Sequence, residues 1–362
     1  MGKPGVLSDR TLKDLMSGGF ITGIEDKFVN PGSLDLPLDQ EAFRLEKAFL
    51  PRPGQTVRSM LGMLGATPHD LKAPLEVGIP YLIHVRGNIE LPQDAFAYAN
   101  PKSSTGRVNL IAKMLRDGVA MYDAITKGTP QGETWILVKA ESFPIILSPG
   151  LAISQLRFFD GVSFLDPIEL ETAMRKDGLL FHPDGKRYAK EEYQKHADSF
   201  FLSVRVHKGI VGWESRGSNK VLDFSKVGCY KPEQFFVPLE AKGDYIELRR
   251  GSFYILTTDP CVRVPPHLSA ELRATDQRLG NSRVHSAGFI DAGWGYGKSG
   301  EVLGRPITLE VMVYEDNVLL QHGQNVVRIR YERMRELPEV PYDEAPSNYT
   351  VQSVAKLSKH FV

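Results

Sequence analysis

The sequence contains two segments that match each other at a constant spacing of 173 residues. Residues 80–83 read Pro-Tyr-Leu-Ile, and residues 253–256 read Phe-Tyr-Ile-Leu. Gly150 and Gly323 stand at the same spacing. Such a spacing indicates one domain written twice, with the copies diverged. The two halves should therefore share a fold, and the positions at which they differ should separate chemistry from scaffold.

The bulk composition fits two ordinary domains and excludes several classes of protein. A chain of 362 residues can build two cores. Lys plus Arg and Asp plus Glu both number 44, so the net charge of zero argues against a nucleic-acid or acidic-membrane binder. Two cysteines cannot form a disulfide framework or a four-cysteine zinc site. Because the sequence lacks a signal-peptide pattern and any apolar run of 18 residues, we expect a cytoplasmic protein with no membrane partner.

Each half opens with the signature of a helix. Ser8 can cap a short helix that stops at Gly18 and Gly19. In the second half, residues 166–169 read Asp-Pro-Ile-Glu, which combines an N-cap, a proline at the first helical position and a glutamate two residues later. The second helix is expected to end at Gly178.

The sequence that follows each opening helix is typical of β-strands. Short β-branched and aromatic runs are broken by Pro, Gly and Asp, which predicts a mainly β fold of two barrel-like domains with a few short helices. The expected domains are 1–160, 161–340 and a polar C-terminal tail, 341–362. The strands expected from these runs are 81–85, 134–140, 201–206, 253–257, 307–314 and 326–331.

One segment of the first half has the composition of a phosphate site. Residues 100–107 read Asn-Pro-Lys-Ser-Ser-Thr-Gly-Arg and precede a helical pattern over 108–116. A helix start offers unpaired N–H groups and positive dipole density. Ser103 and Ser104 add donors, and Lys102 and Arg107 add charge. The alternative interpretation is an ordinary helix start beside a basic residue.

Two segments of the second half stand out as well. Residues 284–295 are rich in glycine, which lets a backbone close over a ligand, although a β-turn with a packed Trp294 would look the same. The next segment, 307–314, alternates so that its apolar residues share one face and Glu310 lies on the other. A lone carboxylate on a strand is most often simply solvated.

Taken in order, these motifs resemble the dCTP deaminase family of the dUTPase-like superfamily. The segment 30–36, Asn-Pro-Gly-Ser-Leu-Asp-Leu, and the segment 102–107 match the family's Asn-Pro-x-Ser-Ile/Leu-Asp and Lys/Arg-Ser-Ser-x-x-Arg patterns. The resemblance implies two dUTPase-like distorted β-barrel or jelly-roll domains in tandem. It implies that Ser103 and Ser104 contact phosphates, that Lys102 holds the triphosphate, and that Arg107 lies at the reacting end.

The second half is similar to the family's nucleoside side. Residues 284–295 resemble its nucleoside-binding hairpin, and Ile307–Glu310 resembles the Ile-x-Leu-Glu that carries the catalytic glutamate. The resemblance implies that Asp291 binds the deoxyribose 3′-hydroxyl, that the ring of Trp294 blocks a 2′-hydroxyl and that the backbone at Ala287 reads the base. The C-terminal segment 349–359 resembles the family's lid. The further nucleotide-binding residues implied are Gln155, Ser286, Ile290, Tyr349 and Gln352.

The two halves have lost different parts of this set. At the 173 spacing the counterpart of Glu310 is Leu137, and the counterpart of Gln155 is Arg328. We match residues 268–273, Leu-Ser-Ala-Glu-Leu-Arg, with the phosphate motif, which makes Ser269 and Arg273 an alternative second-half site. The first half therefore should hold the phosphates and the second the nucleoside, in a homo-oligomer whose geometry the sequence leaves open.

The activity implied is hydrolysis of dCTP to dUTP and ammonia, within pyrimidine deoxyribonucleotide synthesis that leads to dUMP. Glu310 would accept and then donate a proton, Ser103 would help place the water, and Arg107 with the Ala287 carbonyl would steady charge. No His-x-Glu or Cys-x-x-Cys occurs, so we expect no protein-bound metal, and Mg²⁺ would arrive with the triphosphate. The alternatives are a dUTP pyrophosphatase or bifunctional enzyme, with Asp291 activating water, and a non-catalytic nucleotide-binding regulator.

Overall fold

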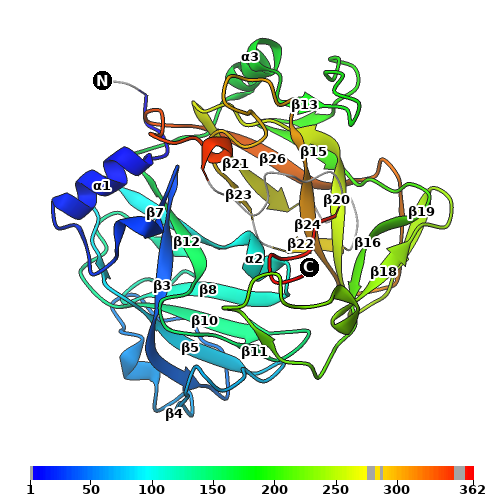
Figure 1. Cartoon of the computed structure of the whole chain (residues 1–362). Coiled ribbons are helices and arrows are strands. Elements are labelled where there is room, and N and C mark those ends of the chain that lie inside the picture. Colours follow the sequence, from blue (N-terminus) through cyan, green and yellow to red (C-terminus); the bar gives the residue numbers. More distant parts are fainter. Residues whose placement is uncertain (1–2, 275–281, 286–287, 346–354) are drawn as a thin grey trace. The chain divides into compact units, whose positions relative to one another are not determined.

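The computed structural model describes residues 3–274, 282–285, 288–345 and 355–362 (Figure 1). It divides into two compact units. Unit 1 comprises Met1–Val162, Gly217–Phe235 and Ser358–Val362, and unit 2 comprises Ser163–Arg216 and Phe236–Leu357. Unit 1 thus takes in two segments from late in the chain, whereas the sequence suggested contiguous domains. No helix among the described residues is long and apolar enough to cross a membrane.

Unit 1 is built on one sheet that nearly closes on itself. Its strand order is β8-β10-β5-β3-β12-β7-β9, with β2 and β4 added to β3, and β8 at one end contacts β7 and β9 at the other. Figure 1 shows β8, β10 and β5 side by side. The elements are α1 (Asp9–Ser17), β1 (Ile21–Thr22), β2 (Val29–Asn30), β3 (Ser33–Arg44), β4 (Thr67–Pro68), β5 (Pro80–Val85), β6 (Asn88–Ile89), β7 (Phe96–Pro101), α2 (Ser103–Gly106), β8 (Leu110–Arg116), β9 (Ala124–Ile125), β10 (Thr134–Ala140), β11 (Ile145–Ile146), β12 (Ala152–Phe159) and β17 (Leu222–Asp223).

Unit 2 contains two main sheets that share one core. The first has the order β18-β16-β20-β24-β22 with β13 on β20, the second has the order β14-β15-β26-β21-β23, and β19 pairs with β25. Leu256 and Leu309 of the first sheet belong to the same buried cluster as Leu202 and Ile329 of the second. The elements are α3 (Pro167–Asp177), β13 (Leu180–Phe181), β14 (Lys195–His196), β15 (Ser199–Ser203), β16 (Ile210–Ser215), β18 (Phe236–Glu240), β19 (Tyr245–Leu248), β20 (Phe253–Val262), β21 (Leu268–Ala274), β22 (Ser282–His285), β23 (Phe289–Ile290), β24 (Arg305–Val313), β25 (Val318–Gln321) and β26 (Asn325–Arg333).

The strand pairing confirms that a mainly β domain occurs twice in the chain. In unit 1, β10 pairs antiparallel with β5, and Leu137 lies opposite Leu82. In unit 2, β24 pairs antiparallel with β20, and Glu310 lies opposite Ile255. Glu310 follows Leu137 by 173 residues, and Ile255 follows Leu82 by the same number. The two units therefore repeat the strand register as well as the residue types.

A side-chain contact repeats at the same spacing. The Tyr81 hydroxyl accepts a hydrogen bond from the backbone N–H of Glu76 at 3.2 Å. The Tyr254 hydroxyl accepts one from the backbone N–H of Arg249 at 2.7 Å. Both tyrosines are almost fully buried, so each needs a partner for its hydroxyl, and both units satisfy this need in the same way.

The two predicted opening helices are confirmed, and their caps are the expected ones. The Ser8 hydroxyl accepts a hydrogen bond from the N–H of Arg10 at the start of α1. At the start of α3, Asp166 and Glu169 form a reciprocal capping box. Gly178 follows α3 with a φ of 66°, a left-handed conformation that glycine adopts without strain.

The helix expected over residues 108–116 is absent, because this segment is strand β8. Asn109 has a φ of 52°, which stops the helical conformation directly after α2. The strand pairs with β10 along its whole length. Burial alternates only over residues 110–114, where Leu110, Ala112 and Met114 are buried and Lys113 is exposed, because Leu115 and Arg116 are buried as well. Pairing with β10 therefore makes this segment a strand, although its residue pattern favours a helix.

Two segments from late in the chain complete unit 1. Strand β17 pairs in parallel with β11, and Phe235 packs edge-on against Phe143 with ring centroids 4.8 Å apart. The C-terminal residues belong to this assembly, because Phe361 pairs with Tyr230 as an isolated bridge. The end of the segment expected as a polar tail or lid is packed, since Ser358 and His360 are buried.

Candidate functional site

The phosphate-side motif of unit 1 is part of a polar cluster. The Lys102 ammonium donates a hydrogen bond to the Asp35 carboxylate, and Asn30 donates to the same carboxylate at 3.0 Å. The Ser33 hydroxyl donates to the side-chain oxygen of Gln155 at 3.3 Å. Strand register places Gln155 directly opposite Asp35. Segments 30–35, 102 and 155, which are far apart in the sequence, are thus brought together.

The serines of the motif lie on a single helical turn. Ser103 begins α2, and Ser104 and Arg107 are each 4% exposed. The turn is fixed to β12, because the Thr105 hydroxyl donates to the carbonyl of Ile153 at 2.8 Å. Because α2 spans only four residues, the helix dipole expected from the sequence contributes little. The positive charge that the motif offers to a phosphate therefore comes mainly from the side chains of Lys102 and Arg107.

The C-terminal residues reach this motif, which the sequence did not indicate. The Ser358 hydroxyl donates to the backbone carbonyl of Ser104 at 2.9 Å. Burial lowers the pKa of the adjacent Lys359, and the charge of Lys102 lowers it further, while Asp35 acts in the opposite direction. Asp35 and Lys359 are therefore members of the cluster that sequence reasoning did not select. The signal for Asp35 was its place in the Asn-Pro-x-Ser-Leu-Asp segment, and the signal for Lys359 was its place at the end of the C-terminal segment 349–359.

The glycine-rich hairpin of unit 2 is held firmly at its base. The carbonyl of Asp291 accepts the N–H of Trp294 at 3.2 Å, which closes a turn after β23. Trp294 is 8% exposed, and its ring lies 5.1 Å from that of Tyr342. Gly293 has a φ of 92°, and a Cβ there would come within 2.6 Å of the Pro341 side chain. A packed tryptophan in a glycine-rich turn is thus what the structure shows, with Ile290 buried and Asp291 half-buried beside it.

Glu310 occupies a buried position in the middle of β24. Glu310 is only 3% exposed. The alternative interpretation from the sequence, a carboxylate solvated at the surface of the strand, is therefore excluded. The residue lies between Ile255 of β20 and His285 of β22 in strand register. The equivalent position of unit 1, Leu137, is an apolar member of a buried cluster. A carboxylate thus replaces an apolar residue at one register position of the repeated sheet.

The sequence match between residues 268–273 and the phosphate motif is wrong. Strand register places Arg273 opposite Arg328, just as Asn100 lies opposite Gln155 in unit 1. Arg273 therefore corresponds to Asn100 of strand β7, and not to Arg107 of the turn that follows it. Ser269 is buried on the same strand, β21. The error arose because a Ser-x-x-x-Arg spacing was matched without the strand that precedes it.

Several residues expected at the site lie outside the described residues. They are Ser286 and Ala287 of the hairpin and Tyr349 and Gln352 of the C-terminal segment. The described candidates fall into two groups, one in each unit. Unit 1 holds Lys102, Ser103, Ser104, Arg107 and Gln155, and unit 2 holds Ser269, Arg273, Ile290, Asp291, Trp294 and Glu310.

Two family models match the chain in tandem. The 2′-deoxycytidine 5′-triphosphate deaminase (DCD) N-terminal domain matches residues 3–162, and the C-terminal domain of the same family matches residues 179–361. The chain belongs to the dCTP deaminase family. The repeat is thus the pair of deaminase domains, and the resemblance read from the sequence motifs is confirmed.

Individual relatives agree with the family assignment. The chain is 30% identical over 159 residues to "dCTP deaminase, dUMP-forming" of Beutenbergia cavernae, a match that covers 42% of this chain and 79% of that protein. It is similar, with a TM-score of 0.85 and 31% identity, to the crystal structure of 2′-deoxycytidine 5′-triphosphate deaminase from Agrobacterium tumefaciens. That likeness covers 93% of this chain and 98% of the other. The two-domain deaminase fold is therefore common to both.

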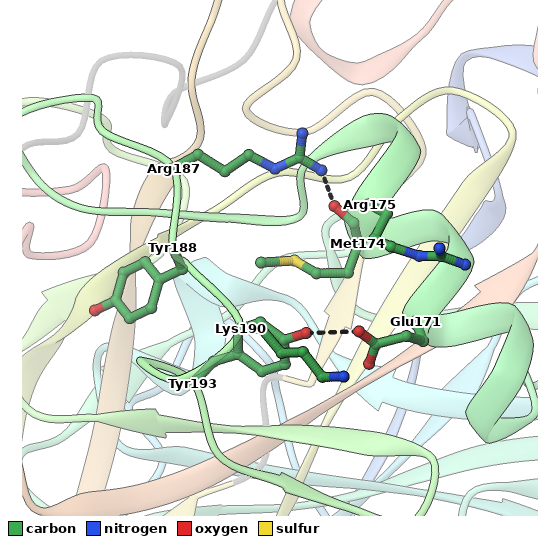
Figure 2. A pocket seen from close by; sticks show the side chains of 7 residues that line it. All are labelled: Glu171, Met174, Arg175, Arg187, Tyr188, Lys190 and Tyr193. Atoms are coloured by element: carbon green, nitrogen blue, oxygen red, sulfur yellow. Dashed lines mark hydrogen bonds between the residues drawn. The ribbon is translucent and has the colours of Figure 1, made fainter.

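Unit 2 contains a pocket of about 320 Å³ that is lined by residues from 171 to 193 (Figure 2). Its carboxylate, Glu171, accepts a hydrogen bond from Tyr193 at 3.0 Å and pairs with Lys195 at 2.9 Å. Arg187 donates to the carbonyl of Met174 at the pocket's edge. None of the residues that form this pocket is a candidate of the deaminase site. The lining residues are Glu171, Met174, Arg175, Arg187, Tyr188, Lys190 and Tyr193.

No group of three or more His, Cys, Asp or Glu side chains is arranged to hold a metal ion in the part of the chain that the structure describes. The acidic residues of the two site groups are Asp35, Asp291 and Glu310. Asp35 is bound by Lys102 and Asn30.

Proposed function

We propose that the chain hydrolyses dCTP to dUTP and ammonia, with Glu310 as the proton-transferring group. The observation that carries this proposal is the buried carboxylate of Glu310 at the register position that Leu137 occupies in the other copy. A buried carboxylate is costly to keep in a sheet that can hold leucine there. Its retention in a deaminase-family domain therefore favours a chemical role over a packing role.

The reaction needs one group that both accepts and donates a proton. Glu310 takes a proton from water as the oxygen attacks C4 of cytosine, and the proton is passed to N3. Glu310 next takes the proton of the new C4 hydroxyl and passes it to the amine, so that the C4–N bond breaks, ammonia leaves and a carbonyl remains at C4. Ser103 helps place the water, and Arg107 with the Ala287 carbonyl steadies charge near it. These four protein groups carry out or support the proton transfers in the scheme. Mg²⁺ is bound to the triphosphate and enters as part of the substrate.

The nucleotide is divided between two kinds of unit in this proposal. Unit 1 provides the phosphate side through Lys102, Ser103, Ser104 and Gln155. Unit 2 provides the nucleoside side through Ile290, Asp291, Trp294 and Glu310, and the hairpin residue Ser286 and the segment of Tyr349 and Gln352 add to it. The site is expected to form within a homo-oligomer in the cytoplasm, in the synthesis of pyrimidine deoxyribonucleotides.

A second candidate is a bifunctional enzyme that continues to dUMP and pyrophosphate. It is favoured by the relative named "dCTP deaminase, dUMP-forming", which is 30% identical over 159 residues. Asp291, half-buried after β23, would activate the water that attacks the triphosphate. Incubation with dCTP and Mg²⁺ distinguishes the two reactions. The simple deaminase accumulates dUTP and ammonia, whereas the bifunctional enzyme releases pyrophosphate in equal amount with dUMP.

The role of Glu310 is tested by Glu310→Gln, which keeps the shape and removes the exchangeable carboxylate. We expect kcat for ammonia release to fall by about 10²- to 10⁴-fold, the usual contribution of general acid–base catalysis. Glu332→Gln is the matched control, because Glu332 is a fully buried carboxylate of the same unit that accepts a hydrogen bond from Ser163. Equal losses in both variants, or full activity in Glu310→Gln, would remove Glu310 from the mechanism.

A further inference from the structure

We propose that the pocket lined by residues 171–193 of unit 2 is a second ligand site, which binds a nucleoside monophosphate (Figure 2). The helix α3 forms one side of this pocket, and the segment that carries Tyr188 and Tyr193 forms the other. The site is independent of the proposed function, since none of its residues takes part in the deamination scheme.

The segment that forms the pocket is longer than its counterpart in the first copy of the domain. Leu34 of β3 and Phe200 of β15 hold equivalent positions, because their strand partners stand 173 residues apart. The link from the opening helix to this position covers residues 18–33 in unit 1 and residues 178–199 in unit 2. Unit 1 builds the shared fold with the shorter link, so the additional chain of unit 2 is available for a function of its own.

Three cationic side chains line the pocket. They are Arg175 of α3, Arg187 at the end of the β13 hairpin and Lys190 of the turn that follows. Within the described part of the chain, none of the three forms an ion pair with a carboxylate. Arg187 donates a hydrogen bond to the carbonyl of Met174, which fixes its guanidinium at the edge of the pocket. A guanidinium presents a fork of N–H donors that matches the oxygens of a phosphate.

The carboxylate that lines the pocket, Glu171, is already compensated. One of its oxygens accepts a hydrogen bond from the Tyr193 hydroxyl at 3.0 Å, and the other pairs with the Lys195 ammonium at 2.9 Å. Lys195 does not itself line the pocket. The charges of Arg175 and Lys190 are therefore in excess at the lining, which favours an anionic ligand.

Other carboxylates in the neighbourhood do not cancel this excess. Glu192 and Asp259 act on Tyr188 through their charge. Glu192 accepts the backbone N–H of Ala189 at 2.6 Å, and Asp259 pairs with Arg205 at 3.2 Å. Both carboxylates thus have partners outside the pocket, and neither lines it.

The pocket also offers rigid apolar surfaces to a flat ring. Tyr188 and Tyr193 line it together with the buried side chain of Met174. The Tyr188 ring stacks on the ring of His182, with centroids 3.9 Å apart and 10° between the planes. The Tyr193 ring packs edge-on against Phe200 at 5.1 Å. Because both rings are held by neighbours, little conformational entropy is lost when a nucleobase packs against them.

A nucleoside monophosphate combines the features that this lining recognises. Its base is flat and can pack against the tyrosines and Met174, and its phosphate can accept hydrogen bonds from Arg175, Arg187 and Lys190. The volume of about 320 Å³ lies near the lower end of the range usual for small-molecule sites, which suits a single mononucleotide.

The experiment measures the binding of AMP to the full chain by calorimetry. AMP is the probe because adenine differs from the cytosine that the deaminase motifs are expected to bind. Adenosine lacks the phosphate and ribose 5-phosphate lacks the base, so we expect each to bind at least about tenfold more weakly than AMP. Binding of either compound as tight as that of AMP, or no binding of AMP at about 1 mM, would overturn the proposal.

Substitutions locate the binding in the pocket. Arg175→Met and Lys190→Met each remove one exposed charge, and we expect each to weaken AMP binding by about tenfold with an unchanged kcat for dCTP deamination. Lys176→Met is the matched control, because Lys176 is an exposed neighbour of Arg175 on α3 that does not line the pocket.

The two outcomes of this comparison are distinct from those of the deaminase assay. If Arg175→Met and Lys190→Met bind AMP as Lys176→Met does, AMP binds elsewhere and the pocket is not a nucleotide site. AMP binding that depends on Arg175 and Lys190, in a wild-type protein that does not deaminate dCTP, would support the second site and contradict the proposed function.

Discussion

At the scale of single residues, one register position distinguishes the two copies most clearly. Glu310 and Leu137 take the same place in equivalent strands, and both are buried. The apolar residue packs against Leu82 and its neighbours, while the carboxylate belongs to the proposed chemistry. The sequence was sufficient to find this pair, because the 173-residue spacing aligns the two strands, although the burial of Glu310 could be seen only in the structure.

His360 makes the stability of the protein depend on pH. Burial lowers the pKa of its imidazole to about 4, from an ordinary value of 6.5. Between these values the unfolded chain binds a proton that the folded chain does not, so stability is full above pH 6.5 and falls as the pH drops toward 4. The loss is on the order of 3 kcal/mol at pH 4.

The measurement is thermal unfolding from pH 7.5 to 4 for wild type and His360→Asn. The asparagine can still donate to the carbonyl of Lys226 but does not titrate, so its curve should be flatter than that of wild type across this range. The exposed His207→Asn serves as the control and should follow the wild-type curve. Parallel curves for wild type and His360→Asn would show that His360 is not the group responsible.

At the scale of elements, burial pattern was a better guide than helix propensity. The strands at 134–140 and 253–257 were predicted because β-branched and aromatic residues cluster there, and the structure confirms them in β10 and β20. The segment 108–116 was misread, because Leu, Ala, Lys, Met and Arg all favour helices. Only the pairing with β10, a contact distant in the sequence, makes this segment a strand.

The hairpin of unit 2 depends on Gly293. Its φ of 92° suits glycine, and an added Cβ would meet Pro341 at 2.6 Å. We expect Gly293→Ala to destabilise the protein by about 1–3 kcal/mol and to raise KM for dCTP, because the turn that holds Asp291 and Trp294 must shift. Thermal unfolding and steady-state kinetics check the two effects.

Gly209→Ala separates crowding from backbone strain in this test. Gly209 has a φ of 101°, but nothing lies within 4 Å of where its Cβ would be. It should therefore show the conformational penalty alone, of about 1 kcal/mol, with an unchanged KM. If Gly293→Ala behaves in the same way, then the contact with Pro341 does not shape the hairpin.

At the scale of the whole molecule, the chain is not two independent copies laid end to end. Residues 217–235 and 358–362 build part of unit 1, where Leu222 and Phe235 are almost fully buried. The repeat predicted the shared register, but it could not predict this exchange, because each segment joins unit 1 through contacts with residues far away in the sequence. The hydrogen bond from Ser358 to the backbone carbonyl of Ser104 could not be predicted for the same reason.

The central claim is that the first copy holds the phosphates and the second holds the nucleoside and the acid. Arg107 and Arg273 test it most directly, since register places Arg273 on strand β21 and not at the position of Arg107. We expect steady-state dCTP deamination by Arg107→Ala to fall by about 10²-fold or more, and that by Arg273→Ala to stay within a few-fold of wild type. Loss of activity in Arg273→Ala with an unaffected Arg107→Ala would contradict the account.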